Sequence, residues 1–133
     1  MKTVLFFVLA LCSLPTWNLV NAATLVIELG PRSFSLVGDE GQVLRTGPIS
    51  AARKGMVTPK GMFQVRSKNV HGYSKKYHAK MPYAVFFNKN IAVHAGYIPA
   101  NRAGTSHGCV HLTPADARFV YGKMHVGDSV IVQ

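Results

Sequence analysis

Short apolar runs with turn residues between them make up most of the chain, and this pattern restricts the fold more than any other feature. Residues 24–29 (TLVIEL) predict a first strand, which Gly30 and Pro31 stop. Residues 33–37 alternate polar and apolar side chains, and the GDEG sequence that follows turns the chain into residues 42–44, which predicts a β-hairpin. Further strands are predicted at residues 62–67, 84–87, 91–94 and 129–133. This spacing is typical of a mainly β sandwich or barrel.

One short helix is predicted near the C-terminus. Thr113 offers a capping side chain, Pro114 suits the first helical position, and Asp116 places an acid in the first turn. Apolar side chains then recur at helical spacing, at Ala117, Val120 and Tyr121. Gly122 is the residue expected to end the helix.

The N-terminal segment, residues 1–22, has the layout of a secretory signal peptide. Lys2 precedes an apolar core, and residues 20–22 (VNA) form an acceptable cleavage site. The apolar run is shorter than the roughly 20 residues that a membrane span needs, so no stable span is expected. Leu11 stands before Cys12, where a lipoprotein signal needs a small residue. We therefore expect export to the periplasm or cell wall.

The chain is strongly basic, with a formal net charge of +10, and loss of Lys2 with the signal leaves +9. A basic exported domain is attracted to anionic cell-envelope polymers. Nucleic acid is the other usual partner of a basic chain, but export and the lack of a dense Lys/Arg block with interleaved aromatics argue against it. Residues 23–133 are long enough for one core and show no linker or repeat, so we expect one domain and a monomer.

Cys109 is the single cysteine left after signal cleavage, in the sequence SHGCVH, so it has no partner for a disulfide within the mature chain. His94 ends the apolar run at residues 91–94 and offers an imidazole fifteen residues upstream. A nearby imidazole can take the proton of a thiol and favour the nucleophilic thiolate, so this pattern indicates a cysteine acyl-transfer site. An inert buried cysteine and a core histidine are the alternatives.

Four segments in order resemble the L,D-transpeptidase catalytic domain family, whose members cross-link peptidoglycan stem peptides through a cysteine. Residues 58–63 (TPKGMF) look like the family's TPxGxF segment, and residues 81–87 (MPYAVFF) resemble its MPY strand. Residues 92–96 (AVHAG) match the strand that carries the family's histidine, and residues 106–110 (SHGCV) match the signature around its nucleophile. The resemblance covers roughly residues 24–133.

The resemblance implies a β-sandwich or barrel-like catalytic fold, with one short helix after Cys109, that acts on peptidoglycan stem peptides without a cofactor. Cys109 would be the nucleophile and His94 the general base and acid, oriented by the carbonyl of Ala95 or Gly96. A turn at Gly108 would aim backbone N–H groups of residues 107–109 at an oxyanion. Residues 68–80, with four lysines and two histidines, predict a loop that touches substrate, since long loops in the family help to shape the groove.

Two further positions near Cys109 each allow more than one role. Ser106 is expected either to hydrogen-bond within its loop or to help hold the substrate. His111 stands two residues after the nucleophile, where the family usually has arginine, and a neutral imidazole lacks the fixed charge of a guanidinium. Arg102 and Arg118 are candidates to replace that charge for a substrate carboxylate.

Other functions fit parts of the same pattern. His107, Cys109 and His111 alternate, so with His94 they would also suit a zinc site. If water resolves the thioester, the site is an L,D-carboxypeptidase or endopeptidase. A basic wall-binding domain without activity is a further alternative, against which the intact Cys109 and His94 count.

Overall fold

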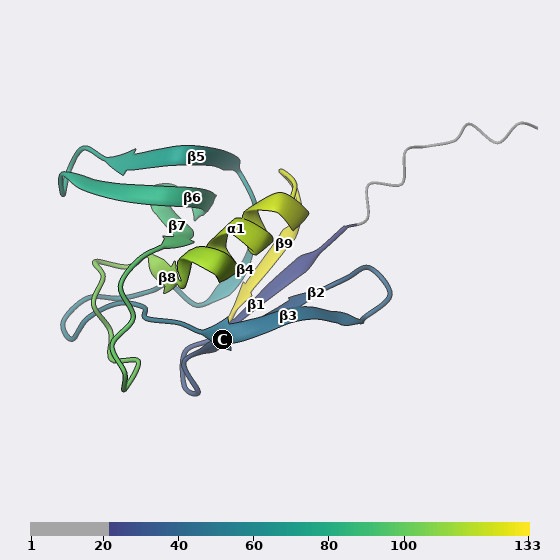
Figure 1. Ribbon diagram of the computed structural model, residues 1–133, viewed down its shortest axis with the longest axis horizontal. Coiled ribbons are helices and arrows are strands. Elements are labelled where there is room, and N and C mark those ends of the chain that lie inside the picture. The colour runs from purple at the N-terminus through teal and green to yellow at the C-terminus, as the bar shows by residue number, and fades with distance from the viewer. Residues whose placement is uncertain (1–21) are drawn as a thin grey trace, which may run out of the picture.

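The computed structural model describes residues 22–133, so the predicted signal peptide lies outside the described residues except for Ala22. Two sheets and one helix form the described part (Figure 1). The elements are β1 (Thr24–Glu28), β2 (Ser33–Val37), β3 (Val43–Pro48), β4 (Gly61–Gln64), β5 (Ser67–Ser74), β6 (Ala79–Asn88), β7 (Ile91–Ala95), β8 (Val110–Leu112), α1 (Pro114–Lys123) and β9 (Ser129–Val132). The expected mainly β architecture with one short helix after Cys109 is confirmed.

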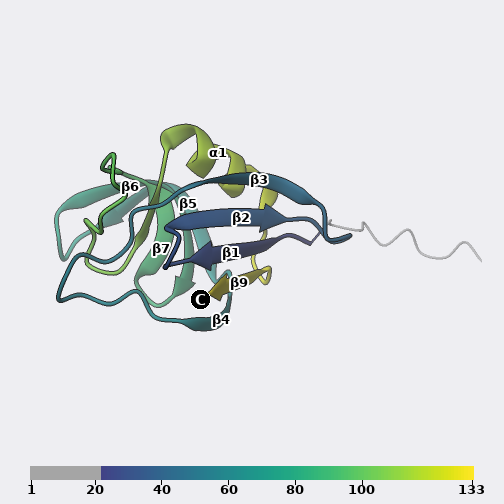
Figure 2. The same cartoon turned by 90° about the horizontal axis from the view of Figure 1, so that it is seen from below.

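The first sheet has the strand order β3-β2-β1-β9-β4, and Figure 2 shows its strands side by side. Buried and half-buried positions alternate along β1 and β2, because every second side chain points to the core. Leu25, Ile27, Phe34 and Leu36 fill that face. The predicted hairpin is confirmed, since β2 pairs antiparallel with β3. The C-terminal strand β9 lies inside the sheet, where it pairs parallel to β1 and antiparallel to β4.

The second sheet has the order β5-β6-β7-β8, and it corrects the loop predicted at residues 68–80. β5 and β6 pair antiparallel as a long hairpin, with Ser74 opposite Ala79, so only the residues between the two strands form a turn. β5 is an edge strand with mostly exposed side chains, and it therefore lacks the apolar alternation that marks a strand in sequence. Backbone pairing with β6 holds it in place.

The parallel pair β7 and β8 separates two sets of side chains. Val93 lies opposite Val110 and His94 opposite His111. Val93 and Val110 face the main core and are essentially fully buried. Since successive side chains of a strand point to opposite faces, His94 and His111 lie on the other face, and so does Cys109 just before β8. This second face carries the candidate site.

Helix α1 begins where predicted but ends later. Thr113 is the cap, its Oγ1 accepts a hydrogen bond from the Asp116 N–H at 3.2 Å, and Pro114 is the first helical residue. Gly122 was expected to end the helix, but it lies inside α1, which continues to Lys123. The reason is packing, because Met124 at the C-cap is fully buried and its N–H bonds back to the Val120 carbonyl.

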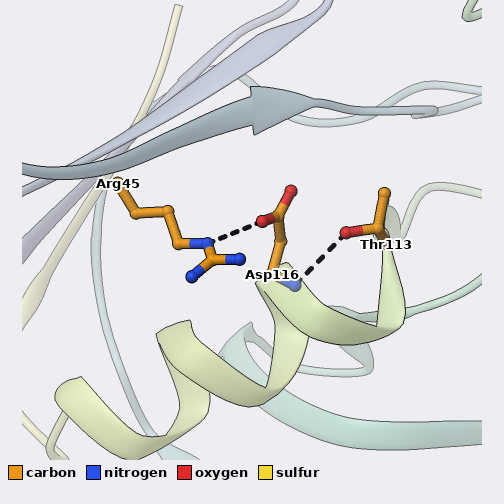
Figure 3. Close-up of polar contacts among 3 residues, drawn as sticks. All are labelled: Arg45, Thr113 and Asp116. Carbon is orange, nitrogen blue, oxygen red and sulfur yellow. Dashed lines mark hydrogen bonds and ion pairs between the residues drawn. The ribbon is translucent and has the colours of Figure 1, made fainter.

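An ion pair joins α1 to the first sheet (Figure 3). Arg45 of β3 donates from Nε to Oδ1 of Asp116 at 2.7 Å, and Arg45 also lies over the Phe119 ring at 4.8 Å. Asp116 is a buried residue in the first turn of the helix, where a negative charge also meets the free N–H groups. The pair therefore connects the helix that follows β8 to an edge strand of the opposite sheet.

We expect Asp116→Ala to lower the free energy of unfolding by about 2–3 kcal/mol, because it removes a charged hydrogen-bond partner and leaves Arg45 uncompensated. Urea denaturation of Asp116→Ala, Arg45→Met and the double variant would measure this. Arg118→Ala, at an exposed position of the same helix, is the control and should change stability little. Additive effects of the Asp116 and Arg45 changes would contradict a stabilising pair.

Candidate active site

The loop that carries Cys109 is held by hydrogen bonds from both sides. Ser106 is buried, its hydroxyl donates to the Cys109 carbonyl, and the same oxygen accepts from the Gly108 N–H at 3.1 Å. Thr58 is also buried, and its hydroxyl donates to the Gly108 carbonyl at 2.9 Å while accepting from the Ala52 N–H at 3.1 Å. These bonds set the backbone direction of the loop just before the thiol.

Gly108 occupies a conformation that other residues rarely adopt, with φ of 147°. A Cβ at this position would also come within 3.1 Å of the Val57 carbonyl. Of the three N–H groups expected to face an oxyanion, that of Gly108 is already donated to Ser106. The N–H groups of His107 and Cys109 are the two remaining candidates.

The Cys109 thiol lies half-buried against the start of β7. Its Sγ accepts from the Ala92 N–H at 3.5 Å and lies 3.7 Å from the Asn90 carbonyl. Burial raises the pKa of the Cys109 thiol, and the Ala92 hydrogen bond only partly offsets that effect. The neighbouring imidazoles were expected to favour the thiolate, but in this geometry the protonated thiol is the resting form.

His94 is buried, with 5% of its surface exposed. Its Nδ1 lies 2.7 Å from the Ala95 carbonyl. A carbonyl can only accept, so Nδ1 carries the proton and Nε2 keeps a lone pair. Burial is the main reason that the pKa of His94 is lowered to about 4; the nearby His111 lowers it further, and the Ala95 hydrogen bond opposes both. His94 is therefore neutral at pH 7 and able to accept a proton.

His111 packs edge-on against His94, with ring centroids 4.8 Å apart. Its Nδ1 lies 2.9 Å from the Tyr97 carbonyl and 3.2 Å from Thr105 Oγ1, so this nitrogen also carries a proton. Gly96 allows the arrangement, because a Cβ there would come within 2.5 Å of the His111 ring. The residue at the family's arginine position thus supports the His94 ring and contributes no fixed charge.

A cleft of about 840 Å³ opens over this face and is lined by Cys109, His94 and His111. The turn between β5 and β6 covers one side, where Tyr77 stacks on His107 with ring centroids 3.6 Å apart and planes 5° from parallel. Sequence reasoning expected this segment to touch substrate, although as a loop. It did not single out Tyr77, Tyr97 or Thr105, whose contacts join residues distant in the sequence.

The remaining candidates lie elsewhere or form no shared site. Arg102 and Arg118 do not line the cleft, and Arg102 bonds to the Arg32 carbonyl. Within residues 22–133, no three His, Cys, Asp or Glu side chains are placed to hold a metal ion. His107 is exposed and stacked on Tyr77, so the alternating pattern does not build the zinc ligand set that it suggested. No helix of the described residues is long and apolar enough to cross a membrane.

Comparison with known proteins places this geometry in a family. The model of the L,D-transpeptidase catalytic domain (YkuD) family matches residues 22–132, so the chain belongs to that family. No curated protein sequence matches significantly.

Solved structures of L,D-transpeptidases share the fold. The Stackebrandtia nassauensis enzyme is 27% identical with a TM-score of 0.78 over 84% of this chain and 55% of its own. The Mycobacterium smegmatis enzyme is 27% identical with a TM-score of 0.75 over 85% and 59%. L,D-transpeptidase 3 from Mycobacterium tuberculosis, solved with a faropenem-derived adduct, is 26% identical with a TM-score of 0.75 over 85% and 60%. This chain therefore spans less than two thirds of the length of these relatives.

The lowered pKa of His94 predicts a loss of stability in acid. The unfolded chain binds a proton below about pH 6.5, whereas the folded chain resists it until about pH 4. The contribution of His94 to the free energy of unfolding is thus complete above pH 6.5 and falls by about 3 kcal/mol as the pH drops to 4. Urea denaturation of wild type and His94→Gln between pH 4 and 8 measures this, and the variant should show a shallower decline. Parallel curves for the two proteins would contradict it.

Proposed function

We propose that this chain is an exported cysteine L,D-transpeptidase that remodels peptidoglycan through a thioester on Cys109. The observation that carries the proposal is that Cys109 and His94 lie on one face of the β7–β8 pair and line the same cleft. Family membership supports the reaction class. The basic charge suits an anionic envelope, and the predicted signal peptide supports the periplasm or cell wall as its location.

Acylation begins from a neutral thiol and a neutral imidazole. Cys109 Sγ attacks the carbonyl carbon between an L-centre and the terminal D-amino acid of a tetrapeptide stem, and His94 Nε2 takes the thiol proton. The N–H groups of His107 and Cys109 would receive the oxyanion, since the Gly108 N–H is donated to Ser106. The C–N bond then breaks, His94 returns the proton to the departing amine, and a thioester remains.

The second half-reaction reverses these roles. An acceptor amine attacks the thioester carbonyl, His94 accepts its proton, and the C–S bond breaks with the proton returned to Cys109. Water in place of the amine would make the same site an L,D-carboxypeptidase or endopeptidase. Muropeptide products formed by the purified domain distinguish cross-linking, exchange and trimming.

Covalent chemistry at a single residue is the first test. A stem tetrapeptide or a carbapenem should add one acyl group to Cys109, detected by intact-mass spectrometry of the mature protein. Cys109→Ala is the matched control and should remain unmodified. An adduct on that variant, or none on folded wild type, would remove the nucleophile assignment and leave a wall-binding domain as the better description.

His94 as general base predicts a kinetic defect. His94→Ala should slow acylation by about 10²- to 10⁴-fold, the usual range for loss of a general base. His94→Gln can keep a hydrogen bond to the Ala95 carbonyl and should be equally slow, which separates lost packing from lost basicity. His125→Ala, at an exposed position outside the cleft, is the control. Acylation at the wild-type rate in folded His94→Gln would return His94 to a structural role.

A further inference from the structure

The turn between β5 and β6 brings lysines to the nucleophile. Tyr77 lies in this turn and stacks on His107, which precedes Cys109 by two positions in the sequence. Lys76 precedes Tyr77, and its Nζ lies 5.3 Å from the Tyr77 ring centroid. The turn is therefore attached directly to the loop that carries the thiol.

The cleft carries positive charges that no acidic side chain of its described lining neutralises. Lys75, Lys76 and Lys80 line it, and among the described residues that line it none is acidic. Within residues 22–133, the ion pairs found join Arg45 to Asp116 and His125 to Asp128, so none neutralises a cleft lysine. Charges of one sign that gather around a cleft attract a ligand of the opposite sign.

The remaining described residues that line the cleft include no lysine or arginine. His111 stands at the position where the family usually has arginine, and its Nδ1 proton is already shared between Tyr97 and Thr105. Arg102 and Arg118 are outside the lining. Fixed positive charge in the cleft therefore comes from the β5–β6 hairpin, from Lys75 and Lys76 in the turn and Lys80 in β6.

We propose that Lys75, Lys76 and Lys80 bind the α-carboxylate of the second residue of the donor stem peptide and select stems in which that carboxylate is free over stems in which it is amidated. This inference rests on the proposed function. An exposed lysine pair contributes little alone, but three lysines facing one anion in a partly enclosed cleft act together. Amidation removes the negative charge and keeps nearly the same shape, so it isolates the electrostatic contact.

The test uses two synthetic stem tetrapeptides that differ at one group, the α-carboxyl of the second residue, which is a free D-glutamate in one and an amidated D-isoglutamine in the other. Release of the terminal D-amino acid is measured with the mature protein at low salt. We expect kcat/KM to favour the free carboxylate by about tenfold, mainly through KM, and the preference to shrink at high salt. Equal values for the two peptides in wild type would overturn the inference.

Two triple variants assign the preference to the lysines of the β5–β6 hairpin. Lys75→Gln, Lys76→Gln and Lys80→Gln together should bring the ratio of the two peptides close to one. Lys54→Gln, Lys60→Gln and Lys123→Gln together remove the same charge from exposed positions outside the cleft and should keep the wild-type ratio. Selectivity that persists in the first variant would overturn the inference, because the lysines would then be only solvated. Selectivity that disappears equally in both variants would overturn it in favour of an effect of net charge.

Failure of the proposed function gives a different result. If neither peptide releases its terminal residue or acylates Cys109, the transpeptidase assignment itself is wrong. If both react but at equal rates, the chemistry stands and the role of the lysines is wrong.

Discussion

The parallel register of β7 and β8 is the constraint on which the site depends. Val93 and Val110 lie opposite each other in the core, and their burial fixes which face of each strand is turned inward. A slip of one residue would turn the whole set to the other face, so this register also places Cys109, His94 and His111 together on the cleft side. Packing of Val93 and Val110 therefore positions the three side chains on the cleft side.

Burial sets the resting charge state of that chemistry. Removal from water raises the pKa of the Cys109 thiol and lowers the pKa of His94 to about 4, so neither group is charged at rest. The Ala95 carbonyl holds the Nδ1 proton of His94 and leaves Nε2 to accept another. A base that takes the thiol proton during attack fits this arrangement better than a preformed ion pair.

His111 stands at the position where the family usually has arginine, so this position carries no fixed positive charge. The His111 ring packs closely against Gly96 and edge-on against the His94 ring. The lysines that line the same cleft, Lys75, Lys76 and Lys80, belong to the β5–β6 hairpin. The Tyr77–His107 stack connects the turn of that hairpin to the loop that carries Cys109.

The sequence by itself determined the elements whose signals are local. The apolar run at residues 24–29 and the alternation along residues 33–37 predicted the first strands, and Thr113 and Pro114 predicted the start of the helix, because these patterns act within a few residues. Four matching segments in order, from residues 58–63 to residues 106–110, likewise predicted the family, which is confirmed.

Tertiary structure decided what depends on partners distant in the chain. The edge strand β5 has no apolar alternation and exists through pairing with β6, and Gly122 stays helical because Met124 is buried. The contact of His111 with His94 depends on strand register, and the protonated thiol of Cys109 depends on the depth of its burial. Register and burial are properties of the packed chain, so no local sequence pattern carries them.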